Sequence, residues 1–268
     1  RELALMVSSK RFPDLEKKRD PALRDRLDRF RAEPAAFFYP PDPTETGASL
    51  GGTAATNASG ARTFRYGPTR SWIRGLRVML ADGRVLAIPR GKYFASPSGT
   101  FSVCDAQGPT RLVQVPDYAL PRTKNTCGFF AAPHMDLADL FIGAEGVLGI
   151  VTAVEVALAV QQDRISIIQF LASDASAVEL ADALRKDHRL HMDFLEFYSG
   201  RALDLLRQRR KADPKAMDMP DIPESAGAAL FLDLDWDPEG PTDELDALQA
   251  AISRSGAGYD AHTSCSDR

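Results

Sequence analysis

The stretch from Thr44 to Ala61 consists almost entirely of small residues, and nothing in it is bulkier than Glu45 and Leu50. Without bulky side chains the main chain can come within hydrogen-bonding distance of a ligand, and glycine permits this best. Successive backbone N–H groups in such a segment can form a concavity that favours anions, phosphate above all. The stretch therefore predicts a loop that lies against a nucleotide-type cofactor. A tight β-corner whose small residues merely pack closely is the alternative.

Two sequence blocks carry a resemblance to a known family. The first runs through residues 51–60 and continues in Tyr66-Gly67 and in residues 76–83, and the second covers residues 139–152. In this order they resemble the flavin-contacting segments of FAD-linked oxidases of the vanillyl-alcohol oxidase type, also called the p-cresol methylhydroxylase fold. The most similar branch contains D-lactate dehydrogenases, the glycolate oxidase flavoprotein subunit and alkyl-dihydroxyacetone-phosphate synthase. The likeness covers residues 37–160 well and the remainder in outline.

The resemblance implies an α+β protein. It implies a p-cresol methylhydroxylase-type FAD-binding domain in residues 1–161, followed by part of an α+β substrate (cap) domain in residues 162–268. The implied cofactor is FAD, and no Gly-x-Gly-x-x-Gly follows a strand to suggest a Rossmann site. The residues that match the family's cofactor-binding segments are Asp42, Thr44, Ser49, Gly51, Gly52, Thr56, Asn57, Ala58, Ser59, Glu145, Gly146, Gly149, Ile150 and Val151.

The implied activity is oxidation of a small 2-hydroxy acid of the D-lactate or glycolate type, with hydride transfer to the flavin. Electrons would leave to a quinone, to an electron-acceptor subunit or to oxygen. Two alternatives stay open: a flavin-binding or assembly module that is incomplete on its own, and a synthase-like flavoenzyme of the alkyl-dihydroxyacetone-phosphate type. Residues 1–39 contain no glycine, so the family's first pyrophosphate loop is not seen. Its paired histidines are not seen either, and the catalytic group stays unassigned.

Other side chains that could do chemistry form weaker patterns. His188 and His191 have a spacing that two metal ligands on a helix could use, but no third ligand accompanies them, so no metal is predicted. His134 could act as an acid or base, although a solvated loop histidine is the simpler interpretation. Asp233, Asp235, Asp237 and Glu244 match the acidic positions of a calcium loop, but Pro238 stands where that loop needs glycine. Arg207, Arg209, Arg210 and Lys211 are interpreted as a solvated helix end.

Composition narrows the class of protein. The 268 residues are 44% hydrophobic and 26% charged, as in an ordinary globular protein. The formal net charge of −4 gives no support for nucleic-acid binding. Three widely spaced cysteines suggest neither a disulfide framework nor a zinc site and fit a reducing compartment. No signal peptide is expected and residues 140–160 contain two glutamates and three glycines, so we predict a cytoplasmic protein without a membrane span.

Hydrophobic periodicity predicts the elements that must position these residues. We expect a surface helix after Asp20-Pro21, a hairpin of residues 72–80 and 84–88, and a long insertion at residues 90–135 that contains a short strand at residues 111–115. Residues 149–160 predict a strand with Val151, Ala153 and Glu155 on one face and Ile150, Thr152, Val154 and Val156 on the other. Strands at residues 165–171, 192–197 and 228–235 alternate with helices at residues 175–186, 200–211 and 243–253, which predicts a sheet with its helices on one side.

Overall fold

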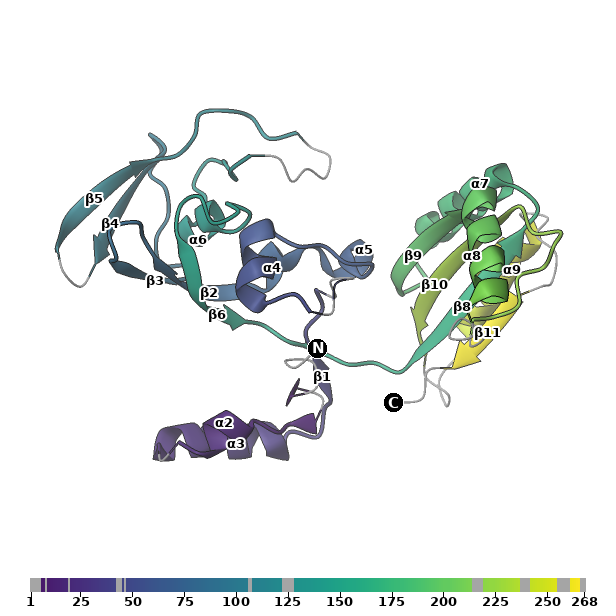
Figure 1. Ribbon diagram of the computed structural model, residues 1–268, viewed down its shortest axis with the longest axis horizontal. Coiled ribbons are helices and arrows are strands. Elements are labelled where there is room, and N and C mark those ends of the chain that lie inside the picture. Colours follow the sequence, from purple (N-terminus) through teal and green to yellow (C-terminus); the bar gives the residue numbers. More distant parts are fainter. Residues whose placement is uncertain are drawn as a thin grey trace. The chain divides into compact units, whose positions relative to one another are not determined.

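The computed structural model divides into two compact units, Arg1–Gln161 and Gln162–Arg268, which Figure 1 shows with the chain coloured along its length. The structure describes residues 6–7, 9–18, 20–41, 45, 47–105, 108–121, 128–213, 219–236, 242–254 and 261–265. Each unit combines helices with antiparallel sheet, so the predicted α+β class is confirmed. The two units are described separately below.

The first unit begins with helices α2 (Pro13–Glu16) and α3 (Pro21–Ala32). The carboxylate of Asp20 accepts hydrogen bonds from the backbone N–H groups of Ala22 and Leu23, and Pro21 follows at the first helical position. Both features favour a helix start, because the first turn has no intrahelical acceptors. The predicted surface helix is confirmed, with Leu27 as its buried residue.

A three-stranded antiparallel sheet forms the centre of the first unit. Its strands are β2 (Ile73–Met79), β3 (Val85–Pro89) and β6 (Ile150–Val156), in the order β3-β2-β6. Gly83 closes the β2–β3 hairpin with a φ of 81°, where glycine carries no steric penalty, so the predicted hairpin is confirmed. Strands β1 (Phe37–Phe38) and β7 (Ala159–Val160) pair antiparallel in a separate two-stranded sheet.

The predicted alternation along β6 is wrong. Val78 pairs with Val151 and Arg77 pairs with Ala153, so Thr152 is an extra residue in the ladder, and its hydroxyl donates to the carbonyl oxygen of Arg77 over 3.1 Å. Such a bulge moves the residues before it to the opposite face. Val151 therefore packs against the same core as Val154, whereas an unbroken alternation would place the two side chains on opposite faces of the strand.

The two ends of the insertion lie side by side in the first unit. Ala95 N donates to the carbonyl oxygen of Met135 over 2.9 Å, and Leu137 N donates to that of Tyr93 over 2.8 Å. Between these contacts β4 (Thr100–Asp105) and β5 (Gly108–Gln114) form an antiparallel hairpin. The strand near residues 111–115 is thus confirmed, and its partner β4 was not predicted.

The second unit contains a four-stranded antiparallel sheet in the order β11-β8-β10-β9. The three predicted strands and three predicted helices are confirmed; β11 was not predicted. The elements, in chain order, are β8 (Arg164–Leu171), α7 (Asp174–Lys186), β9 (Met192–Ser199), α8 (Gly200–Ala212), β10 (Ala228–Asp235), α9 (Asp243–Arg254) and β11 (Ala261–Cys265).

Helices cover both faces of this sheet, so the prediction of helices on one side is wrong. Leu230 and Leu232 of β10 belong to a core that includes Leu180 of α7 and Leu248 of α9. Ala229, which points the other way, packs in a separate core with residues of α8. The physical reason is that the second face of β10 also carries apolar residues, Ala229 and Phe231, which need a cover.

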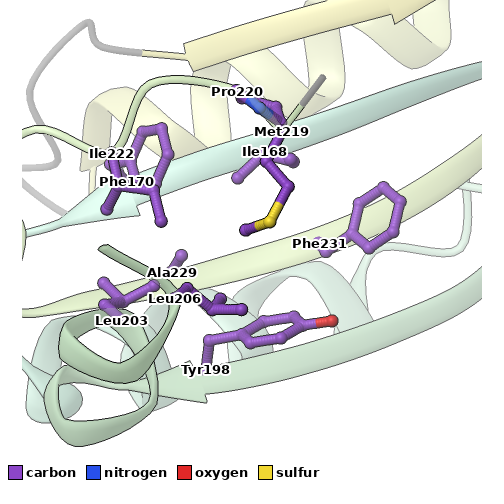
Figure 2. Close-up of a pocket in the computed structure, with 10 residues that line it drawn as sticks. All are labelled: Ile168, Phe170, Tyr198, Leu203, Leu206, Met219, Pro220, Ile222, Ala229 and Phe231. Carbon is purple, nitrogen blue, oxygen red and sulfur yellow. The ribbon is translucent and has the colours of Figure 1, made fainter. Parts of the chain in front are cut away.

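The α8 face also holds an apolar hollow of about 210 Å³ beneath the strap of residues 219–226. Figure 2 shows Met219 extending from the strap into this space. Arg207 of α8 donates to the carbonyl oxygen of Ala226 over 2.9 Å, and Arg210 donates to that of Met219 over 3.1 Å. The interpretation as a solvated helix end is therefore wrong for Arg207 and Arg210, which hold the strap, whereas Arg209 and Lys211 are exposed.

Candidate functional site

The glycine-containing stretch forms a helix where a loop was predicted. Helix α4 (Leu50–Thr56) begins at Ser49, whose hydroxyl oxygen accepts a hydrogen bond from Gly52 N over 3.0 Å. Such a cap compensates in part for two glycines in the first turn. A Cβ atom on Gly51 would lie 3.2 Å from the carbonyl oxygen of Val151, so this glycine allows α4 to approach β6 closely. In Figure 1, α4 lies beside β6.

A left-handed residue ends α4. Asn57 has φ 48° and ψ 49°, a conformation that asparagine tolerates better than most residues. Ala58 N donates to the carbonyl oxygen of Thr53 over 2.9 Å, and Thr69 donates back to the carbonyl oxygen of Ala58. These bonds place residues 57–59 at the end of the helix in a defined geometry.

The second block follows helix α6 (Leu137–Phe141), which Asp136 caps by accepting from Ala138 N over 2.8 Å. After α6 the chain turns through Gly143, Glu145 and Gly146, all with positive φ. Glu145, at φ 51°, is a non-glycine residue in the left-handed region. The segment then enters β6 at Ile150.

The two blocks meet. Gly143 N donates to the carbonyl oxygen of Ala54 over 3.0 Å, and Glu145 N donates to that of Ala55 over 2.8 Å. The last carbonyls of α4 are thereby satisfied by the turn after α6. We call residues 50–59 together with residues 143–151 the glycine corner.

Some amides of the glycine corner are used by the fold itself. Val147 N donates to the carbonyl oxygen of Ala144 over 2.9 Å, in addition to the two amides that bond to α4. The amides of Gly146 and Leu148 have no acceptor among the described residues. In the turn after α6, these two amides are available to a ligand.

Arg70, in the short helix η1 (Thr69–Trp72), connects the parts of the corner. Its backbone N donates to Oδ1 of Asn57 over 2.9 Å. Its guanidinium donates to the carbonyl oxygen of Asp139 over 2.7 Å and to that of Ile142 over 2.5 Å, and it pairs with the Asp139 carboxylate over 3.0 Å. One side chain therefore caps the carboxyl end of α6 from another segment.

Asp139 also binds a second arginine. Arg90 Nη2 lies 3.0 Å from Oδ1 of Asp139, and Arg90 Nε donates to the carbonyl oxygen of Ile73 over 2.7 Å. The ring of Phe130 lies 4.3 Å from the Arg70 guanidinium carbon, within cation–π distance. Burial lowers the pKa of Arg70, and the Asp139 carboxylate opposes that shift. Both arginines are mostly buried at a single carboxylate.

The structure places most of the predicted cofactor residues in the glycine corner. Ser49 precedes α4, and Gly51, Gly52 and Thr56 lie within it. Asn57, Ala58 and Ser59 follow it. Glu145, Gly146 and Gly149 lie in the turn after α6, and Ile150 and Val151 begin β6; Asp42 and Thr44 fall outside the described residues. Arg70, Arg90 and Asp139 were not predicted, because single charged residues in strand-like or apolar segments carry no spacing signal.

The geometry of the corner tests whether FAD fits. A Cβ atom on Gly146 would meet no heavy atom within 4 Å, so the backbone there faces open space. Beside it, Val147 is 75% exposed and Ile150 is 59% exposed. Apolar side chains next to unpaired backbone amides suit a flat ring system with polar edges. The residues present fit one flank of a flavin site.

Comparison with known proteins supports this interpretation. Residues 27–88 match the family described as FAD binding domain. Together with the fold and the two meeting blocks, this match supports a likeness of the first unit to the FAD-binding domain of FAD-linked oxidases. The expected resemblance and the expected cofactor, FAD, are confirmed.

Three relatives have similar sequences. A D-2-hydroxyglutarate dehydrogenase of Stutzerimonas stutzeri (strain A1501) is 28% identical over 173 residues, which is 64% of this chain and 29% of that protein. Glycolate oxidase subunit GlcD of Bacillus subtilis (strain 168) is 27% identical over 235 residues, 86% of this chain and 40% of that protein. A D-lactate dehydrogenase of Anaerostipes hadrus is 31% identical over 121 residues, 45% of this chain and 18% of that protein. The chain thus spans less than half the length of each of these relatives.

Solved structures show the fold independently. Two structures of alkyldihydroxyacetonephosphate synthase superpose with TM-scores of 0.53 and 0.51, each at 14% identity. They cover 91% and 82% of this chain, and 37% and 35% of theirs. At this identity the likeness concerns the fold alone.

The remaining candidate side chains do not gather into a site in the described part of the chain. His191 pairs with Glu244 through Nδ1, and exposed His134 has a φ of 55°. Within the described ranges no group of three His, Cys, Asp or Glu side chains could hold a metal ion; Asp237 of the calcium-like pattern lies outside them. No helix of the described chain is long and apolar enough to cross a membrane.

Proposed function

We propose that this chain is the FAD-containing part of an oxidoreductase that oxidises a small 2-hydroxy acid. The observation that carries the proposal is the glycine corner, where two blocks far apart in the sequence share backbone hydrogen bonds. The substrate class comes from the relatives, whose names specify D-2-hydroxyglutarate, glycolate and D-lactate. The same proposal includes transfer of electrons from the reduced flavin to a quinone or an acceptor subunit.

The residues of this chain would hold and orient the cofactor. When bound, FAD supplies an acceptor for a hydride from the carbinol carbon. The backbone amides of Gly146 and Leu148 and the apolar surface of Val147 and Ile150 form the contact surface that we assign to the cofactor. Asp42, Thr44 and Ser49 enter this proposal through the family resemblance. The group that removes the hydroxyl proton is not assigned to any residue of this chain.

A visible spectrum of the purified intact protein tests the proposal. Absorbance in the flavin bands, with anaerobic bleaching on addition of D-lactate, glycolate or D-2-hydroxyglutarate, is the expected result. A colourless protein that takes up no added FAD would sink the proposal. Mutation of the exposed pair Val147 and Ile150 to threonine should weaken FAD uptake, while Val178→Thr, exposed to 63% on α7, should not.

The synthase-like fold supports a second candidate, a flavoenzyme that transforms its substrate without net oxidation. Such a protein would hold FAD and keep its absorbance in the presence of all three hydroxy acids. A flavin-binding module that needs another chain would behave in the same way until that chain is added. Bleaching by hydroxy acid alone separates the first proposal from both.

A further inference from the structure

We infer that Arg70 is a positioning residue that sets the geometry of the glycine corner for its cofactor; this inference rests on the proposed function. Between the end of α4 and the end of α6, the residue that bridges the two segments is Arg70. Its backbone N donates to Oδ1 of Asn57, just after α4, and its guanidinium donates to the carbonyl oxygen of Ile142, just after α6. Its side chain is only 17% exposed, so it is built into the corner instead of lying on the surface.

The contacts of Arg70 converge on the point where the chain turns. A Cβ atom on Gly143 would lie 3.4 Å from Cβ of Asn57 and 3.5 Å from Nη2 of Arg70. Gly143 therefore lies against both the left-handed cap of α4 and the guanidinium. The amide of this glycine also makes one of the two bonds to α4. Displacement of Arg70 would change the turn and the α4 cap together.

The shape of the guanidinium matters more than its charge. Arg70 donates to two backbone carbonyls, on Asp139 and Ile142, and to the carboxylate of Asp139. A planar fork can reach these acceptors at once, whereas an ammonium is a compact point charge on a flexible stem. Arg90 already pairs with the same carboxylate, so charge neutralisation of Asp139 does not require Arg70. Arg70 is required to orient the carbonyl groups of Asp139 and Ile142.

The hydrogen bonds of Arg70 also affect the backbone amides that we assign to the cofactor. The carbonyl groups of Asp139 and Ile142 lie in the last turn of α6 and at its C-cap. Ile142 immediately precedes the turn that contains Gly146 and Leu148. When Arg70 holds Ile142, the turn has one starting direction, which pre-organises its amides. Without that bond, the left-handed Glu145 and the glycines on both sides allow other paths.

The test compares Arg70→Lys with the matched control Arg74→Lys, since Arg74 is exposed and its side chain donates to the carbonyl oxygen of Ser71. The first measurement is hydrogen exchange of the intact protein without FAD. We expect faster exchange at Gly143 and Glu145 in Arg70→Lys, with the amides of the β2–β3 ladder unchanged. The second measurement is FAD affinity by flavin fluorescence, where we expect Kd to rise about tenfold in Arg70→Lys alone, as loss of one charge-assisted hydrogen bond predicts.

Several results would overturn the inference. A purely structural role predicts faster exchange across the whole first unit, with the FAD affinity of the folded fraction unchanged. Unchanged exchange at Gly143 and Glu145 would show that Arg70 does not hold the corner. Unchanged FAD affinity in Arg70→Lys, with normal uptake by the wild type, would overturn this inference alone. A wild-type protein that takes up no FAD would overturn the proposed function and this inference with it.

Discussion

The backbone N–H of Glu145 donates a hydrogen bond to the carbonyl oxygen of Ala55, 2.8 Å away. This bond joins the end of α4 to the turn after α6, and it is made by a residue in the left-handed region, at φ 51°. A residue with a Cβ atom is strained there, whereas glycine is not. The hydrogen bond to Ala55 therefore holds Glu145 in a strained backbone conformation.

We expect Glu145→Gly to stabilise the first unit by about 1 kcal/mol, because it removes the left-handed strain while keeping the backbone bond. The measurement is urea unfolding of both proteins. Glu179→Gly is the matched control, since Glu179 is exposed in the middle of α7 and should lose about 1 kcal/mol through lower helix propensity. A destabilised Glu145→Gly variant would show that its side chain contributes more than the strain costs.

Gly149 and Gly146 should respond differently to alanine. A Cβ atom on Gly149 would lie 2.7 Å from Cγ1 of Val78 and 2.8 Å from the carbonyl oxygen of Met79, so β2 or β6 must shift. At Gly146 the same atom meets nothing within 4 Å, and only backbone strain at φ 80° remains. We expect a loss of roughly 3 kcal/mol for Gly149→Ala and about 1 kcal/mol for Gly146→Ala in denaturant unfolding. Equal losses would contradict the packing explanation.

A buried ion pair should dominate the polar contribution to the second unit. Asp193 is fully buried and lies 2.9 Å from Nε of Arg164, which is 10% exposed. Removal of one partner leaves the other charge buried, so Asp193→Ala should cost about 3 kcal/mol in unfolding free energy. The exposed pair of Asp182 and Lys186 is the comparison, and Asp182→Ala should cost about 0.5 kcal/mol or less. Similar costs for the two variants would argue against an uncompensated charge in the core.

The loop after α7 should titrate at low pH. Hydrogen bonds from the side chain of Arg189 and then from its backbone lower the pKa of Asp187 from 3.8 to about 2. Because the folded-state pKa is depressed, the stabilisation is present above pH 3.8 and is lost as the pH falls through about 2.

An NMR titration of the Asp187 carboxyl carbon checks this prediction. In Arg189→Gln the pKa should return toward 3.8, whereas in Arg185→Gln it should stay at about 2. A wild-type titration near 3.8 would show that the hydrogen bond to Arg189 is not formed in solution.

Local patterns determined much of the fold and the identity of the cofactor. The period of apolar residues located α3, the β2–β3 hairpin and the alternating elements of the second unit, because burial of one face imposes that period on the chain. The two blocks pointed to FAD through residues that lie within each block. These signals are short-range, so a single sequence contains them.

Tertiary structure decided the rest. The bulge at Thr152 moved Val151 to the other face, and helices pack on both sides of β10 because apolar residues lie on each of its faces. Ser49 and the packing of Gly51 against Val151 turned a predicted loop into a helix. Arg70 and Asp139 lie 69 positions apart and acquire their role only when the chain brings them together, and no spacing rule relates residues at such a separation.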